Sequence, residues 1–184
     1  MIQIAIAPSP VASTGHRPAT RWLANRELDR YNTAMKAELL KQAYLTGRRN
    51  FSHSDLQNIC LHKAYLSEIN LSDAYLNRAI LSRTNLERAY LNRAILYAAN
   101  LSHAHLFRAS LIETNLEKAN LDRAVLNHAN LSGANFKNAN LQNAQLVWAN
   151  VRSANFKNAN LDGVNFAGAR FFQTIMPDGS IWNS

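Results

Sequence analysis

Large apolar residues recur at every fifth position through most of the chain, from Phe51 to Phe171. The 25 positions of this series hold nineteen leucines, five phenylalanines and one valine. Alanine occupies 18 of the 25 positions that lie two residues earlier, and asparagine occupies 13 of the 25 that lie directly before. These spacings define one unit of five residues repeated along the chain, and no proline interrupts the block.

A period of five is incompatible with burial of the whole series on a regular element. On an α-helix, successive members would lie about 140° apart around the axis. On a flat strand they would alternate between the two faces, because five is an odd number. The series can reach one core only if the chain bends the same way once per unit. We therefore predict an all-β solenoid of stacked coils, in which the other three positions of each unit face water.

The units at residues 119–123 (ANLDR) and 134–138 (ANFKN) resemble the A(D/N)LXX unit of the pentapeptide repeat family. The resemblance covers about two thirds of the chain in one register, and the segments at 38–51 and 176–180 resemble parts of cyanobacterial members. It implies a right-handed quadrilateral β-helix with four units per coil, or about six coils for this chain.

The pattern divides the chain into four segments. These are a flexible arm at residues 1–20, an amphipathic capping helix at 21–48, the repeat solenoid at 49–171 and a C-terminal cap at 172–184. The arm holds three of the four prolines. In the first coil, Ile59 and Ile69 replace alanine and Arg49 replaces a small residue, so this coil is expected to be wider or irregular.

Both ends of an open coil expose core and unpaired backbone, so both need cover. A helix over residues 21–45, ending before Gly47, can cover the first coil. The apolar stripe expected to face that coil consists of Leu28, Tyr31, Met35 and Leu39. The residues expected to cluster at the other end, around a turn at 177–179, are Phe171, Phe172, Ile175, Ile181 and Trp182. This cluster fits either a hydrophobic cap or a dimer interface, so the protein is predicted to be a monomer or a homodimer joined at this end.

The charge of the chain is unevenly distributed along its length. Of the net +8, residues 1–50 contribute +5, the repeats +4 and the tail −1. The single cysteine, Cys60, excludes an intrachain disulfide and a cysteine-based zinc site. No apolar run approaches the roughly 20 residues of a membrane span, and no signal peptide is recognised. These features predict a cytoplasmic protein that does not enter a membrane.

The sequence contains no convincing catalytic constellation. The six histidines are scattered, and no serine–histidine–acid arrangement or glycine-rich phosphate loop is present. His103 and His105 would flank a corner without an acidic or thiol neighbour. We therefore predict no enzyme activity, no cofactor, no metal and no small-molecule substrate.

Stacking at intervals of 20 residues places outward side chains in columns. Asp73, Arg93 and Glu113 are expected to form an alternating charge ladder. Two columns form candidate basic surfaces, namely Lys63, Arg83 and Arg123, and Lys137 with Lys157. The apolar residues that join the candidate interaction surface are Phe107, Val147, Trp148, Tyr75 and Tyr97. Exposed aromatic residues near arginine are typical of protein interfaces.

We predict a non-enzymatic scaffold that binds a protein partner, whose identity the sequence does not give. Two alternatives stay open. One is the binding of a nucleic acid or another anionic partner through the basic faces. The other, implied by the resemblance alone, is a DNA mimic that targets a topoisomerase. The positive charge of the repeats opposes mimicry, because mimicry requires columns of negative charge.

Overall fold

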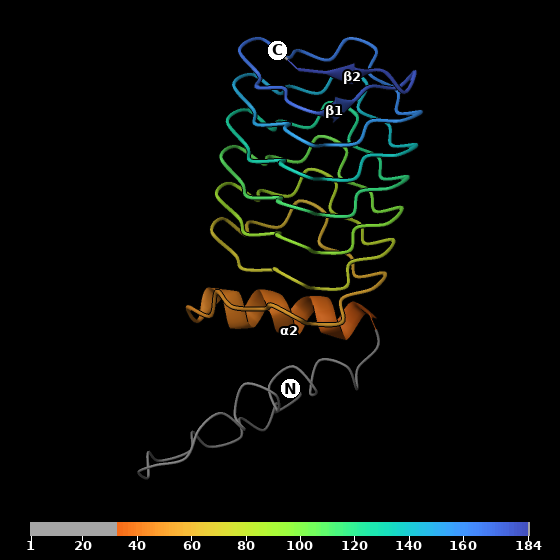
Figure 1. Ribbon diagram of the computed structural model, residues 1–184. Coiled ribbons are helices and arrows are strands. Elements are labelled where there is room, and N and C mark those ends of the chain that lie inside the picture. The colour runs from red at the N-terminus through yellow and green to blue at the C-terminus, as the bar shows by residue number, and fades with distance from the viewer. Residues whose placement is uncertain (1–32, 184) are drawn as a thin grey trace, which may run out of the picture.

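The computed structural model describes residues 33–183, where the chain forms a stack of coils between a helix and a short hairpin (Figure 1). The elements are α2 (Thr33–Leu45), β1 (Thr174–Ile175) and β2 (Ile181–Trp182). The residue before each large apolar residue forms a parallel β-bridge with the residue 20 positions later, from Asn50↔Asn70 to Asn155↔Ile175. All 22 bridges keep this interval, so each coil contains four units and the pairing is regular from the first coil onward.

Each corner of the coil depends on one residue with a left-handed backbone. The residue two positions after the large apolar residue has a positive φ in all 25 units, for example 57° at Arg83. The corner closes when the next small residue donates its N–H to the carbonyl of the large residue, as Ala79 does to Leu76 at 3.0 Å. This conformation costs an L-residue roughly 1–2 kcal/mol, which the burial and pairing of the unit must offset.

Every backbone N–H of residues 70–74 has a partner. Asn70 bonds to the preceding coil, Leu71 and Asp73 bond to the next coil, and Ala74 closes the corner. The remaining N–H, that of Ser72, donates to Asn70 Oδ1 at 3.0 Å. Where asparagine precedes the large residue, its side chain therefore satisfies the one donor that neither the stack nor the corner reaches, which explains its frequency in the sequence.

The interior is a column of leucine side chains and phenylalanine rings, flanked by alanine. Phe136 and Phe156 stack with their ring centroids 4.9 Å apart. Three buried threonines replace alanine, and each hydroxyl donates to a leucine or valine carbonyl 23 residues earlier at 2.7–2.8 Å. These polar side chains therefore enter the core without leaving their hydroxyl groups unpaired.

Helix α2 lies across the first coil, but through a different face from the expected one (Figure 1). The helix buries Lys36, Ala37 and Leu40, whereas Met35 is 49% exposed and Leu39 is 39% exposed. The prediction that Met35 and Leu39 face the coil is therefore wrong. The predicted start of the helix, its residues Leu28 and Tyr31, and the arm at 1–20 lie outside the described residues.

A small residue and two polar anchors accompany one large apolar side chain on this helix face. Ala37 allows the helix to approach the coil closely, and Leu40 is completely buried. Lys36 Nζ donates to Asp55 O at 3.3 Å, and Tyr44 Oη donates to Ser67 O at 2.9 Å. These two bonds attach the helix at two points, so hydrophobicity alone is a poor guide to the contact face.

The predicted helix stop at Gly47 is confirmed. Gly47 has a φ of 98°, its N–H donates to Tyr44 O at 3.0 Å, and Arg48 N–H donates to Ala43 O at 2.9 Å. These two bonds form a Schellman motif, which a glycine at this position favours.

The C-terminal end is only partly covered. Strands β1 and β2 pair antiparallel, and Phe171 packs on Trp182 with ring centroids 5.4 Å apart. Phe172 and Ile181 are exposed, which departs from the compact cluster expected for the tail. The hairpin is too short to extend over the whole last coil, and Leu161 and Phe166 remain only partly buried beside it.

We expect Leu40→Ala to lower the free energy of unfolding by about 3 kcal/mol, because it leaves a cavity between α2 and the first coil. Leu45→Ala removes the same atoms from an exposed position of the same helix and should cost less than about 1 kcal/mol. Chemical denaturation followed by circular dichroism measures both values. Equal losses in the two variants would contradict the described packing of α2.

We expect Gly168→Ala to destabilise the protein by about 1 kcal/mol more than Gly133→Ala. Both glycines have a φ of 68°, but a Cβ on Gly168 would lie 2.6 Å from the Trp148 indole, whereas a Cβ on Gly133 meets Glu113 Cγ at 3.3 Å. The extra loss should disappear in a Trp148→Ala background. Denaturation of the four variants tests this, and an unchanged difference would refute the contact.

Candidate interaction surface

The solenoid has four sides, each with three outward columns. A side consists of the left-handed corner residue of the preceding unit, the residue before the large apolar residue and the residue after it. The sides are numbered by their central columns, which contain every twentieth residue from 50 to 170 (first), 55 to 175 (second), 60 to 160 (third) and 65 to 165 (fourth).

Charge separates these sides into two halves. We call the adjoining fourth and first sides the basic half, and the second and third sides the mixed half. Over the repeats, the basic half has seven basic and two acidic residues, whereas the mixed half has five basic and six acidic residues. The charged residues of the basic half are Lys63, Arg83, Arg88, Arg108, Arg123, Arg152, Arg170, Glu68 and Glu87. The positive excess of the solenoid therefore lies on one half.

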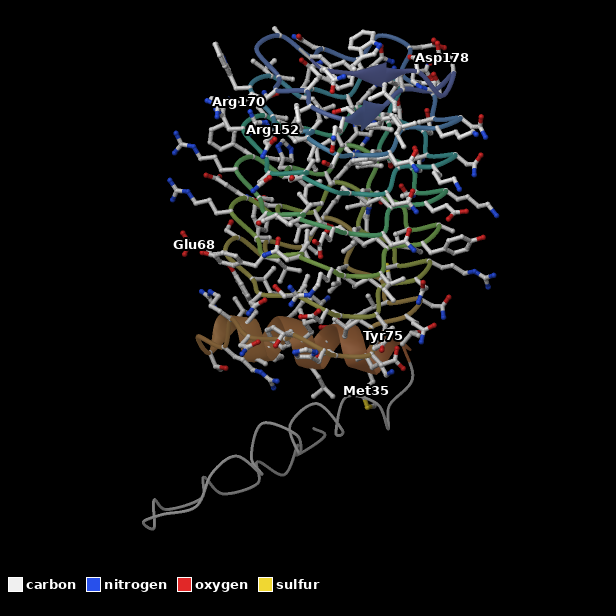
Figure 2. The ribbon with its side chains drawn as sticks, in the orientation of Figure 1. Met35, Glu68, Tyr75, Arg152, Arg170 and Asp178 are labelled. Carbon is white, nitrogen blue, oxygen red and sulfur yellow. The ribbon has the colours of Figure 1, made fainter. Side chains whose placement is uncertain are left out.

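Figure 2 shows this separation, with Glu68, Arg152 and Arg170 on one flank and Tyr75 and Asp178 on the other. Arg170 bridges to Asn150 in the central column of the first side, and Arg152 is two residues beyond Asn150. Tyr75 is in the central column of the second side.

The two acids of the basic half are both close to one arginine. Arg88 Nη1 lies 3.6 Å from Glu68 Oε1, and Arg88 Nε lies 3.9 Å from Glu87 Oε1. Within residues 33–183, the basic residues of this half that have no ion-pair partner are Lys63, Arg83, Arg108, Arg152 and Arg170. The basic half is thus left with unneutralised cations and no unpaired acid.

The mixed half contains the predicted charge ladder. Arg93 Nε and Nη2 donate to Asp73 Oδ1 and Oδ2 at 2.8 and 2.9 Å, and His53 Nε2 lies 3.9 Å from Asp73 Oδ2. The hydrogen bonds from Arg93 lower the pKa of the Asp73 carboxyl, and Asp73 together with the more distant Glu113 raises the pKa of Arg93. This ladder neutralises its charges internally and contributes little stability at an exposed site.

Aromatic side chains accompany the cations of the basic half. Trp148 is 60% exposed and its indole lies over Gly168 in the next coil. The Arg108 guanidinium lies 5.0 Å from the centroid of Phe107, whose ring also meets His128 edge-on at 5.5 Å. The indole is therefore held against backbone at a corner that also presents cations.

The residues singled out from the sequence lie at two separate places. The column of Lys63, Arg83 and Arg123 belongs to the basic half, as do Phe107, Val147 and Trp148. The residues that lie on the second side, in the mixed half, are Lys137, Lys157, Tyr75 and Tyr97.

The surroundings of the second side differ from those of the basic half. Glu117 occupies the same column as Lys137 and Lys157. At the corner of the adjoining third side, Lys118 Nζ donates to Tyr97 Oη at 2.8 Å, and this bond raises the pKa of Lys118. The cations of the mixed half therefore have acidic or phenolic residues nearby.

Sequence reasoning missed Arg108, Arg152 and Arg170 as members of one surface. The signal was present in the period of 20, which places Arg108 at a corner of the first side and Arg152 and Arg170 in the other two columns of that side. Counting charge by unit instead of by side obscures this grouping.

The described residues offer no group of three or more histidine, cysteine, aspartate or glutamate side chains that could hold a metal ion. Over the same range, no helix has the length and apolar character needed to cross a membrane. Cys60 is exposed and unoxidised, and His62 Nδ1 lies 2.7 Å from Ser82 Oγ.

Comparison with solved structures identifies several similar chains. A pentapeptide repeat protein, Rfr23 from the cyanobacterium Cyanothece 51142, is 29% identical, with 76% of this chain and 99% of that chain covered and a TM-score of 0.55. QnrB1, a plasmid-mediated fluoroquinolone resistance protein, is 20% identical over 70% of this chain and 66% of its own, with a TM-score of 0.64. At this identity the likeness to QnrB1 concerns the fold alone.

A third similar chain is alr5209, a pentapeptide repeat protein from Nostoc PCC 7120, which is 29% identical over 73% of this chain and 93% of its own, with a TM-score of 0.43. No curated protein matches the sequence. The pattern that defines pentapeptide repeats matches eight copies over residues 69–106, 104–143 and 139–176. The chain therefore belongs to the pentapeptide repeat family, whose members fold as right-handed quadrilateral β-helices.

Proposed function

We propose that this protein is a non-catalytic scaffold that binds another protein through its outer surface. The observation that carries the proposal is the exposed Trp148, which rests on Gly168 at a corner where Trp148 N–H donates to Ala167 O at 2.9 Å. A large exposed aromatic side chain on a rigid support loses little conformational entropy on binding, and tryptophan is frequent among residues that dominate interface energies.

The rest of the proposal follows from the architecture. We infer a solenoid of about six coils with α2 as its N-terminal cap. The protein would act in the cytoplasm as a monomer or as a homodimer joined at the C-terminal end. The exposed Phe172 and Ile181 beside the last coil support such a dimer, because they would be covered by a second chain.

Binding of a nucleic acid is the second candidate function. The five cations of the basic half that lack ion pairs favour it, because phosphate contacts depend on unneutralised Lys and Arg. Mimicry of DNA is not favoured, since the repeats carry an excess of four positive charges, the opposite sign from DNA.

Affinity capture from the native cell tests the scaffold function directly. The tagged full chain should retain a protein at near-stoichiometric amounts, and nuclease treatment should not release it, because the contact is between proteins. Quantitative mass spectrometry of the eluates measures retention, with the tag alone as the control. Recovery of nucleic acid without such a protein, or of no specific partner under any condition, would contradict the proposal.

A further inference from the structure

We propose that the basic half binds an acidic segment of the protein partner, with its arginines pairing with carboxylates and Trp148 contacting an apolar residue between them. This inference rests on the proposed function and assigns the partner chemistry and the side of the solenoid that it contacts.

The first argument is that the basic half cannot neutralise its own charge. Its acids, Glu68 and Glu87, both lie within 4 Å of Arg88 and compensate that residue. The column of Arg83 continues with Lys63 below and His103 above, so no acid stacks against it. Within residues 33–183, therefore, the solenoid offers these cations no carboxylate partner, and we assign that role to the partner protein.

The second argument comes from the geometry of the solenoid itself. Arg93, at a corner with φ 56°, binds the Asp73 carboxylate through two hydrogen bonds of 2.8 and 2.9 Å. Arg83 and Arg108 occupy equivalent corners with φ values of 57° and 56°. An arginine at this backbone position can therefore form two hydrogen bonds to one carboxylate. In the described part of the solenoid, Arg83 and Arg108 have no such carboxylate partner.

The third argument is the choice of side chains. The basic half has six arginines and one lysine, whereas three of the five cations of the mixed half are lysines. Protein interfaces are enriched in arginine and tryptophan and depleted of lysine. Arginine pairs with carboxylate and phosphate alike, so the exposed indole beside the arginines is the feature that favours a protein partner.

The indole supplies an apolar contact at the junction of the two basic sides. Trp148 lies at the corner between the fourth and first sides, with its ring over Gly168. Along the first side, Arg170 follows Gly168 by two residues, and Arg152 follows Trp148 by four. An acidic segment with one apolar residue matches this combination of separated cations around the exposed Trp148 ring.

The test uses the full chain and a short fluorescein-labelled peptide of glutamate and aspartate with one central leucine. Fluorescence anisotropy at low and physiological salt gives its affinity, and a peptide with glutamine and asparagine in place of the acids serves as the ligand control. Single-stranded DNA of the same charge is measured in parallel. We expect the acidic peptide to bind more tightly than either of the other ligands.

Matched variants locate the binding surface. Arg83→Glu with Arg108→Glu should weaken binding of the acidic peptide by about tenfold or more. Lys137→Glu with Lys157→Glu makes the same charge change on the mixed half and should weaken it less than about threefold. Glutamate already occupies equivalent positions at Glu68, Glu113 and Glu117, so both pairs should fold, and circular dichroism checks this.

A second pair of variants tests the indole. Trp148→Ala should weaken binding about fivefold or more, whereas Tyr75→Ala, which removes an exposed ring from the mixed half, should have little effect. Equal losses on the two halves, no binding of the acidic peptide, or tighter binding of the DNA would overturn the inference. Capture of a protein partner that survives Arg83→Glu with Arg108→Glu would also overturn it, while leaving the scaffold function intact.

Discussion

The structure depends on one left-handed residue in every unit of five. Without it the chain would continue straight, and the large residues would point alternately into and out of the body. The bend lets residue i pair with residue i+20, as in the bridge from Asn100 to Asn120, so that every coil repeats the one beneath it. The strain is tolerated because each unit also buries a large side chain and pairs backbone N–H groups with the neighbouring coils, and in units with asparagine the side chain accepts from one further N–H.

The same constraint organises the surface. Because coils stack without offset, each outward side chain has its neighbours one coil above and one coil below. The charges that surround a residue are therefore those of the residues 20 positions away, in the same column. Where opposite charges alternate, as at Asp73 and Arg93, the column neutralises itself. Where cations follow one another, as at Lys63 and Arg83, they remain available to another molecule. A nearly balanced sequence can thus fold into a solenoid with one strongly basic half.

Much of the fold could be predicted because the series of five-residue units is long and uninterrupted. The spacing of Leu56 and its successors excludes helix and flat strand, and Gly47 stops the helix for a local conformational reason. The contact face of α2 could not be predicted, because Ala37 and Lys36 face the coil beside Leu40, through close approach and hydrogen bonding, while Met35 and Leu39 stay largely exposed. The candidate surface was found in part. Its column at Lys63 follows from the period, but Arg152 and Arg170 lie in the following and central columns of the first side, so they join it only when the fourth and first sides are considered together.

The hydrogen–deuterium exchange footprint of a bound partner tests most directly whether the stacked columns create one functional half. Binding should slow exchange at amides of the fourth and first sides, in segments that recur at intervals of 20 residues and include those around Arg83, Arg108 and Trp148. The intervening segments around Tyr75 and Lys137 should exchange at unchanged rates. Protection confined to those intervening segments, or spread without the 20-residue interval, would contradict the division of the solenoid into a basic, partner-binding half and a mixed half.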